Sequence, residues 1–349
     1  MKRQLDLDRR HALQMLFIAG SVSSKVVLPG SISEAMAQGV TASHADLAAR
    51  IKDEALQFMA ALDPAKARRC SFPFSGAERT RWHWTVPSSV PRNGLMLREM
   101  DASQHKAAMA LLASSLSPSG FDKAQNIMRL QSVLPTGAAD PLAYYVSIFG
   151  DPNAARWGWR LEGHHLSHHF SIVDGQVSMT PFFHGAWPTT TRSGFRAMPR
   201  EEDAARELVM SLSPALRKSA VFQENALSGH VTQNSVSVNA LPVVGLRFAE
   251  LGSAQKALAA EIVATYLAAL PAPISIEKQS RFEASKSDAL SFGWAGSLTP
   301  NRPHYYRIQG ETFLLEFDNS LNEGTHIHLS LIHISEPTRL RRISYAVFC

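Results

Sequence analysis

The chain has 349 residues, of which 45% are hydrophobic and 19% charged, a composition typical of one large or two small globular domains. Its net charge of +5 sits mostly at the two ends, because residues 1–37 and 330–349 each carry +2 and leave +1 for the body. The body charge therefore gives no reason to expect nucleic acid as a partner. After residue 37 no uninterrupted apolar run reaches about 18 residues, so we expect no stable membrane insertion.

The first 37 residues have the features of an export signal. Arg9 and Arg10 precede a moderately apolar stretch, residues 12–28, and Ala35-Met36-Ala37 offers the small residues that signal peptidase recognises. The paired arginines favour the twin-arginine route, although Ala12 stands where that motif usually has a bulky apolar residue. An amphipathic N-terminal helix that stays on the protein is the alternative. We expect a periplasmic or secreted protein.

The body begins with helices and short extended pieces. Apolar residues recur at helical spacing over residues 43–62, and Pro64 closes that helix. Strand-like pieces follow at 71–72 and 81–86. The stretch from Asp101 to Gln104 is a capping-box pattern that predicts a helix to about residue 116, and a second helix is expected to about 134.

The middle and end of the body predict an antiparallel sheet and more helices. Strands are expected at 144–149, 157–161, 164–173 and 176–183, with Asp174-Gly175 as a two-residue hairpin turn. Helices are expected from 199 to about 227 and from 254 to 270, followed by strands at 290–295, 304–309 and 312–317. No internal repeat is apparent. These blocks predict a single α+β domain over residues 38–329, an antiparallel sheet with helices packed on it.

The last 20 residues, 330–349, resemble a translated sequencing adapter, and we expect them to be a non-native tail. A genuine basic terminal strand is the alternative. Without this tail the body keeps one cysteine, Cys70, which cannot form an internal disulfide.

Histidines are unusually dense in two places. Five of the 14 lie within 21 residues, at positions 164, 165, 168, 169 and 184, and a His-X-His pair follows at 326 and 328. Imidazole is the commonest side-chain metal ligand. On a strand, successive side chains point to opposite faces, so His164 and His165 would share one ion only if a bulge follows Gly163. His326 and His328 would share a face.

The histidine pairs predict a metal site. We expect His164, His165, His326 and His328 to bind a divalent metal ion such as zinc. Structural roles are favoured for the other histidines of the first cluster.

Two carboxylates lie beside these pairs in the sequence. Glu162 precedes the first pair and Asp318 precedes the second, so each is a candidate general base or a partner that orients a histidine. An ordinary turn at Asp318-Asn319 is the alternative. The chain lacks a His-Glu-X-X-His motif, a phosphate-binding Gly-Lys-Ser/Thr loop, a Gly-X-Ser-X-Gly elbow and paired Cys-X-X-Cys motifs.

Over roughly residues 45–329 the chain resembles the secreted bacterial and fungal family called domain of unknown function 3500. The most specific blocks are Glu162-Gly163-His164-His165-Leu166-Ser167, Trp157-Gly158-Trp159-Arg160, Glu316-Phe317-Asp318-Asn319 and His326-Ile327-His328. The resemblance implies no activity. The chain departs from the family pattern at His168-His169, where the family has an apolar residue and Asn. In the family the last block continues into a Trp-Arg-Asp-like segment, whereas here the tail follows, which implies that part of the site is missing.

Three hypotheses follow for the function. The first is an exported metal-dependent hydrolase acting on a small molecule, with Glu162 or Asp318 as the base. The second is a periplasmic protein that binds a metal or a small ligand without catalysis. The third is a metal-free pocket in which histidines act as acids and bases. If the two histidine pairs lie close together in the structure, they can form one shared site. If they lie far apart, each pair has an independent role.

Overall fold

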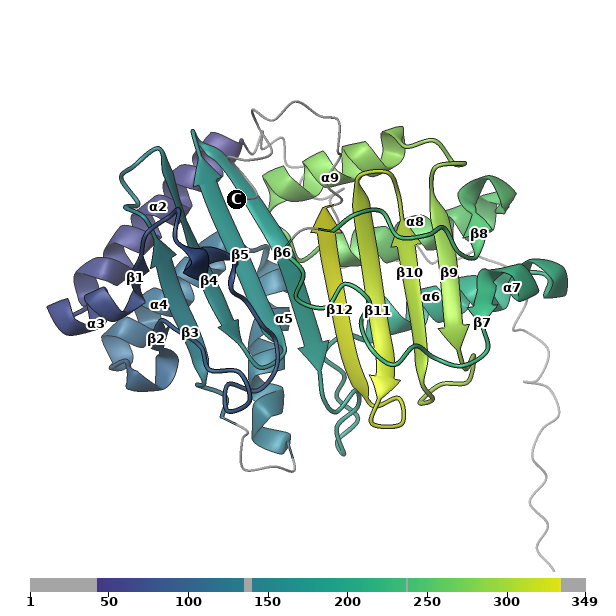
Figure 1. The fold of residues 1–349 in the computed structure, drawn as a ribbon, viewed down its shortest axis with the longest axis horizontal. Helices are drawn as coiled ribbons and strands as arrows, with labels where there is room; N and C mark the ends of the chain where they lie inside the picture. The colour runs from purple at the N-terminus through teal and green to yellow at the C-terminus, as the bar shows by residue number, and fades with distance from the viewer. Residues whose placement is uncertain (1–42, 135–139, 237, 334–349) are drawn as a thin grey trace, which may run out of the picture.

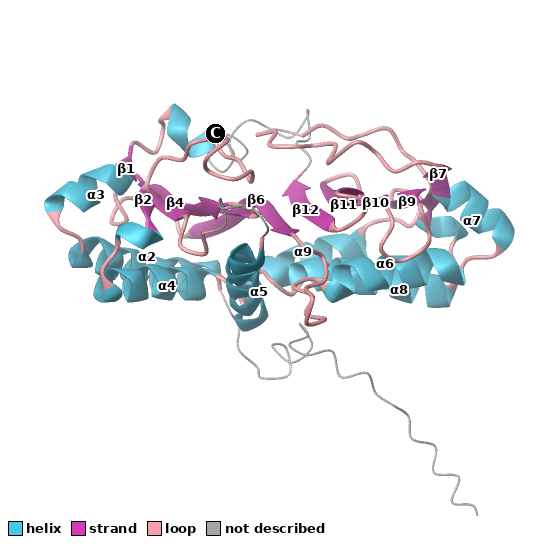
Figure 2. Ribbon diagram, turned by 90° about the horizontal axis from the view of Figure 1, so that it is seen from below, coloured by secondary structure: helices cyan, strands magenta, loops and turns pink. Residues whose placement is uncertain are grey.

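The structure, a computed structural model, describes residues 43–134, 140–236 and 238–333. The predicted export signal lies outside these residues, as does the predicted tail from residue 334 onward. The first residues assigned to that tail, 330–333, continue a strand. Helices cover one face of a single large sheet and loops cover the other (Figures 1 and 2). The predicted single α+β domain is confirmed.

Twelve strands form the sheet. They are β1 (Ser71–Phe72), β2 (Leu95–Met96), β3 (Tyr144–Phe149), β4 (Arg156–Gly163), β5 (Leu166–Val173), β6 (Gln176–Ala186), β7 (Val221–Gln223), β8 (Leu246–Arg247), β9 (Ser291–Gly296), β10 (His304–Gln309), β11 (Phe313–Leu321) and β12 (His326–His333). Their order is β1-β3-β4-β5-β6-β12-β11-β10-β9-β7, with β2 beside β3 and β8 beside β9. The predicted Asp174-Gly175 hairpin joins β5 and β6, as expected.

The sheet is mainly antiparallel, as predicted, with a parallel pairing at each of its two edges. The short edge strands β1 and β7 run parallel to β3 and β9, and the other pairings are antiparallel. Parallel neighbours need a long crossover connection. Two helices lie between β1 and β3 in the chain, and two more lie between β7 and β9, so each crossover has the length that a parallel pairing requires.

Eight α-helices are described. They are α2 (His44–Ala61), α3 (Pro64–Cys70), α4 (Ala102–Ser115), α5 (Pro118–Leu130), α6 (Pro199–Ser211), α7 (Pro214–Ala220), α8 (Ser253–Leu267) and α9 (Ala272–Ala284). The capping box at Asp101 and Gln104 is confirmed, and the predicted first helix buries Leu47, Ile51 and Phe58 against the core.

Two predicted elements are wrong. The helix expected to continue to residue 227 ends at Ala220, and the β-branched and aromatic residues that follow it form β7 instead. The strand expected at 81–86 is a loop. Its carbonyl oxygens accept hydrogen bonds from arginine side chains rather than from a neighbouring strand: Arg160 donates to Arg81 O (2.6 Å) and Arg92 to His83 O (2.8 Å).

The fold repeats itself, although no internal repeat is apparent in the sequence. Residues 44–186 and 199–333 each run as a helix, a short helix, two short strands, two further helices and four long strands. The sheet order is symmetrical about its centre, where β6 of the first half pairs with β12 of the second. We call this β6–β12 boundary the seam. The two halves therefore form one continuous sheet (Figure 1).

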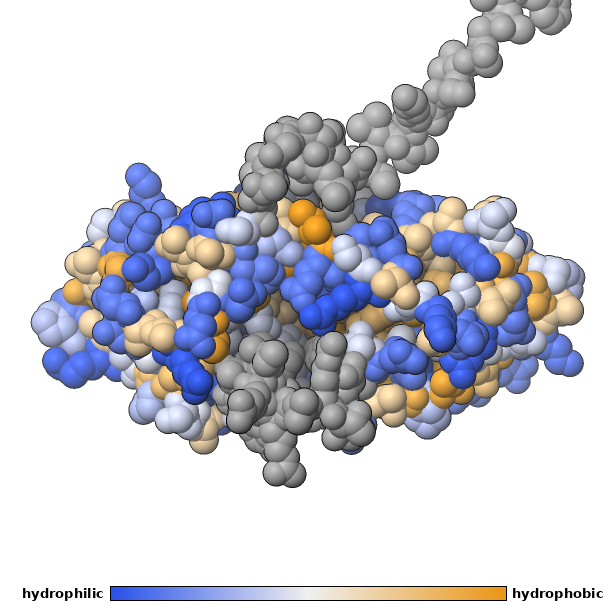
Figure 3. Space-filling model, turned by 90° about the horizontal axis from the view of Figure 1, so that it is seen from above, coloured by the Kyte–Doolittle hydropathy of each residue, from blue (hydrophilic) through white to orange (hydrophobic). Residues whose placement is uncertain are grey.

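The main core fills the space between the sheet and the helices. Large aromatic residues such as Trp157, Trp294 and Tyr306 are fully buried there. The edge of the molecule drawn in Figure 3 is mostly hydrophilic, with apolar residues scattered over it. Among the described residues, no helix has the length and apolar character needed to cross a membrane.

Candidate functional site: a histidine centre at the seam

His164 and His165 form the tight turn between β4 and β5, because Gly163 and Leu166 on either side of them pair with each other. The prediction that they begin a strand is therefore wrong. His165 has a φ of +65°, and its N–H donates to the carbonyl oxygen of Trp84 (2.8 Å). In this turn the two rings lie on the same side, with centroids 3.7 Å apart, which successive strand residues could not do.

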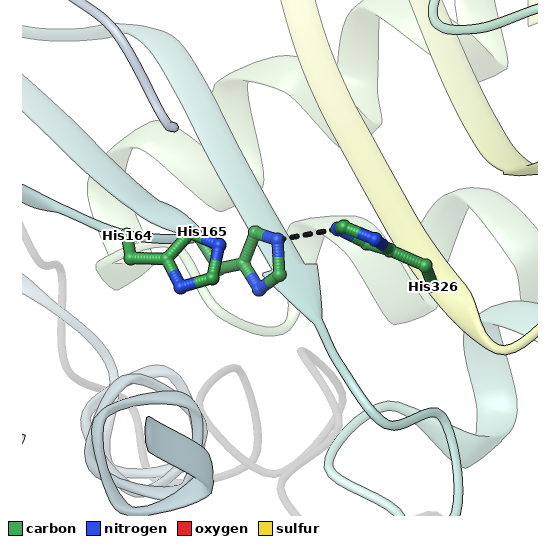
Figure 4. A group of neighbouring side chains, drawn as sticks. All are labelled: His164, His165 and His326. Carbon is green, nitrogen blue, oxygen red and sulfur yellow. Dashed lines mark hydrogen bonds between the residues drawn. The ribbon is translucent and has the colours of Figure 1, made fainter. Parts of the chain in front are cut away.

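The second histidine pair approaches from the other half of the sheet. His326 and His328 lie at the start of β12 with ring centroids 4.6 Å apart, as expected of alternate residues on one face of a strand. His165 Nε2 lies 2.7 Å from His326 Nε2. Figure 4 draws this contact as a dashed line. The two pairs that the sequence analysis singled out therefore converge, and they do so across the seam.

A glycine makes this approach possible. Gly185 on β6 pairs with His328 and lies beside the His165 ring. A Cβ atom added at Gly185 would lie 2.8 Å from His165 Cδ2 and 2.9 Å from the carbonyl oxygen of Ile327. Any larger residue would push the His165 ring away from the seam.

Three of the histidines form a group that could hold a metal ion. One ring nitrogen from each of His164, His165 and His326 lies within 4.8 Å of the others. His328 is their neighbour, with its ring centroid 5.3 Å from that of His165. We call these four residues the histidine centre. All its donors are imidazole nitrogens, which suit zinc, copper, nickel and iron rather than magnesium or calcium.

Side-chain amides determine which nitrogen of two of these rings is free. Gln131 is buried, and its Nε2 donates to the carbonyl oxygen of Ile127 (3.3 Å), so its Oε1 faces His164 Nδ1 at 2.7 Å. A carbonyl oxygen only accepts hydrogen bonds, so His164 Nδ1 carries the proton and Nε2 keeps its lone pair. Asn322 Oδ1 lies 3.3 Å from His326 Nδ1 and has the same effect. Hydrogen bonds of this kind orient metal-binding histidines.

Burial keeps the four imidazoles neutral. It lowers the pKa of His164 to about 3 and the pKa of His326 to about 4. Burial, followed by the charges of neighbouring histidines, holds the pKa of His165 and His328 well below the ordinary value of 6.5. Neutral imidazole is the form that binds metal, so each ring of the centre keeps one unprotonated nitrogen at neutral pH.

The two candidate carboxylates are placed differently. Asp318 Oδ2 lies 3.9 Å from His328 Nδ1 and has no hydrogen-bond partner among the described residues. Burial raises its pKa. Glu162 is buried in ion pairs with Arg160 (3.0 Å) and Arg92 (3.7 Å). Asp318 is therefore in a position to orient His328, whereas Glu162 is already held by two cations.

The remaining clustered histidines pack elsewhere in the sheet. His168 on β5 and His184 on β6 contact each other through their Nε2 atoms (2.7 Å), and His168 stacks on Phe182. His169 Nε2 lies 2.9 Å from Ser167 Oγ. The group of three potential ligands includes none of these residues.

Several residues of the site could not be recognised from the sequence. Gln131 and Asn322 carried no motif, and only the structure shows that they face histidines. Trp187 carried no motif either, and its ring stacks on His326 with centroids 5.2 Å apart. The only hint in the sequence was that Trp187 lies two positions after Gly185, the residue that packs against the His165 ring.

The fold and the site together define a single-domain α+β protein with a buried histidine centre suited to a transition-metal ion. Residues 44–332 match the family model described as "Protein of unknown function (DUF3500)". The match covers most of the chain, so the protein belongs to this family, as the resemblance suggested. The chain matches no curated protein and no solved structure.

Proposed function

We propose that the protein is an exported, metal-dependent enzyme, a hydrolase acting on a small molecule, in which His164, His165 and His326 bind the ion. The observation that carries the proposal is the convergence of three neutral imidazoles from two halves of the chain. Three protein ligands are typical of catalytic zinc sites, which leave a fourth position for water or substrate. An ion bound there would activate water or polarise a substrate oxygen.

The geometry requires a small adjustment to accept an ion. Two nitrogens that bind one tetrahedral zinc at about 2.0–2.1 Å are roughly 3.3 Å apart. His165 Nε2 and His326 Nε2 are 2.7 Å apart, so these rings would separate slightly as the ion enters. Rotation of the His326 side chain provides this movement, because His326 is less buried than His165.

Asp318 is the better of the two candidates for a base. It is buried next to His328 and has an unpaired carboxylate oxygen, so proton transfer through His328 is open to it. Burial raises the pKa of Glu162 as well, but Arg160 and Arg92 already occupy its carboxylate. We therefore assign Glu162 to holding the loop beneath the site, where it also accepts the His83 N–H (3.2 Å).

Metal binding without turnover is the second candidate function. The observation in its favour is the burial of the centre: His165 is 1% exposed and His328 is 6% exposed. His328 would then occupy the fourth position and leave no room for a substrate. Export to the periplasm, where such a protein would hold its ion, fits both functions.

Metal analysis of the purified protein tests the proposal. We expect about one zinc or similar ion per chain, with loss of that ion in His165→Ala and in His326→Ala. His105→Ala, at a partly buried position on α4, is the matched control and should keep the ion. If the wild-type protein takes up no stoichiometric metal, the proposal fails.

The spectrum of the cobalt-substituted protein separates the two functions. A bound water at the fourth position should be replaced by added azide, with a change in the visible bands of Co²⁺. An azide-insensitive spectrum that depends on His328 would instead assign the protein to metal binding without turnover.

A further inference from the structure

Trp187 lies directly beside the histidine centre. The pairing of β6 with β12 ends at Ala186 and Ile327, so the next residues along the two strands, Trp187 and His326, are neighbours across the seam. Their rings are nearly parallel, with an angle of 4° between the planes and centroids 5.2 Å apart. Stacked carbon atoms are separated by about 3.5–4.0 Å, so the two rings are offset rather than directly superposed.

The backbone on both sides of this stack is held in place. The Thr189 N–H donates to the carbonyl oxygen of Thr325 (2.8 Å), which keeps the segment after Trp187 beside the start of β12. The His326 N–H donates to Oδ1 of the buried residue Asn319 (2.9 Å), whose Nδ2 donates to the carbonyl oxygen of Gly324 (2.9 Å). Movement of His326 is therefore movement of its side chain.

That side chain is the least restrained in the histidine centre. His326 is only partly buried, whereas the other three histidines are buried. Its contact with the exposed side chain of Asn322 is 3.3 Å long, beyond the usual range of an N–H···O hydrogen bond. The rings of His165 and His328 meet it at 68° and 71°. Among the described residues, Trp187 alone offers His326 a parallel ring face.

We propose that Trp187 is a positioning residue for the metal ion: its indole holds the plane of the His326 ring while that ring shifts sideways to admit the ion. The shift that separates the Nε2 atoms of His165 and His326 from 2.7 Å to roughly 3.3 Å is about 0.6 Å. An offset stack on a large flat indole survives a shift of this size within the plane. A tilt out of the plane would break the stack. The identity of the ion rests on the proposed function.

Two substitutions separate the flat ring from its bulk. Trp187→Phe keeps a ring face against His326, whereas Trp187→Leu keeps apolar volume and loses the face. Trp187 is only partly buried, so we expect both variants to fold. A residue that merely fills space would be replaced equally well by either side chain.

The first readout needs no metal. In the metal-free full chain labelled with ¹⁵N-histidine, the N–H···N contact between His165 Nε2 and His326 Nε2 should give a nitrogen–nitrogen coupling through the hydrogen bond. We expect this coupling in the wild-type protein and in Trp187→Phe. In Trp187→Leu it should be lost, because the His326 ring then samples other orientations.

The second readout is zinc affinity, measured by competition with a chromophoric chelator. Trp187→Leu should weaken zinc binding about threefold to tenfold, which corresponds to the loss of one aromatic pair. Trp187→Phe should stay within about twofold of the wild-type protein. Wild-type zinc affinity in Trp187→Leu, or equal losses in the two variants, would overturn the proposal. If none of the three proteins binds zinc while the coupling is lost only in Trp187→Leu, the proposed metal function fails and the positioning of His326 by Trp187 stands.

Discussion

Gln131 controls the state of His164 at the residue scale. Its amide is fixed by the bond to Ile127 O and presents an acceptor to His164 Nδ1. Gln131→Met keeps the length of the side chain but removes this acceptor. The proton of His164 is then no longer confined to Nδ1, and Nε2 no longer always has its lone pair free for a metal ion. We expect zinc affinity to fall about 10–100-fold, as it does when comparable histidine partners are removed. Competition with a chromophoric chelator measures this affinity.

The same variant has a readout that needs no metal. In the metal-free wild-type protein, the ¹⁵N shifts of His164 should show the proton on Nδ1, and this preference should be lost in Gln131→Met. Gln279→Met, on α9, is the matched control. A His164 tautomer that is identical in wild type and Gln131→Met would refute the role of Gln131 even if zinc binds.

Gly185→Ala tests whether the seam requires the absence of a side chain. The added Cβ would be too close both to the His165 ring and to the backbone of Ile327, which strand pairing holds in place. Overpacking of this kind costs about 1–3 kcal/mol of unfolding free energy. We expect that loss in urea unfolding of the metal-free protein, together with weaker zinc binding. If Gly185→Ala has the unfolding free energy and the zinc affinity of the wild-type protein, the strands can move apart without a cost in stability.

Histidine density drew attention to the residues that converge, because metal ligands are chemically distinctive, but the same run includes His168, His169 and His184, which do not join them. It could not predict what surrounds them. Gln131 is 33 positions from His164, and a glutamine or asparagine has many other roles in a chain. The need for glycine at 185 arises only from the packing of three segments that are distant in sequence.

At the scale of elements, the β4–β5 hairpin shows why alternation misled the strand prediction. The run from His164 to Ile172 alternates as a strand should, and nothing in it has the glycine or asparagine typical of a two-residue turn. Asp174-Gly175 has that signature and was predicted correctly. His165 instead adopts a positive φ, which is uncommon for a residue with a side chain.

The β5–β6 pair should make the stability of the protein depend on pH. Burial lowers the pKa of His168 to about 3, and that of its partner His184 is also well below 6.5. The unfolded chain takes up protons below about pH 6.5, whereas the folded chain excludes them until about pH 3. Stability is therefore full above pH 6.5 and falls as the pH drops, by up to ~1.4 kcal/mol per pH unit for each such histidine.

Urea unfolding between pH 7.5 and pH 4.5 measures this dependence. The double variant His168→Phe/His184→Leu removes two titrating groups, so its stability should fall less steeply with decreasing pH. The slope should not vanish, because His165, His304 and His328 are also buried with lowered pKa values. Identical slopes in the two proteins would mean that this pair does not resist protonation.

At the scale of the whole molecule, local patterns predicted the α+β class but not the repeat. Helical spacing and hairpin signals act over a few residues, whereas the symmetry depends on the pairing of β6 with β12 across the length of the chain. The halves also differ at the site. The first half has His164-His165 at its β4–β5 turn, and the corresponding β10–β11 turn of the second half has Gly310-Glu311-Thr312. The fold is therefore repeated and the histidine centre is not.

A metal ion at the seam should stabilise the molecule as a whole, because its ligands come from both halves of the sheet. An ion that binds only the folded chain raises the unfolding free energy by about 2.7 kcal/mol when its free concentration is 100 times the dissociation constant. We expect zinc to raise the melting temperature and EDTA to reverse the change. His326→Ala should abolish the response by removing the second half's ligand, whereas His105→Ala should retain it. Equal stabilisation of wild type and His326→Ala would place the stabilising ion elsewhere on the protein, and the seam would then be held by strand pairing alone.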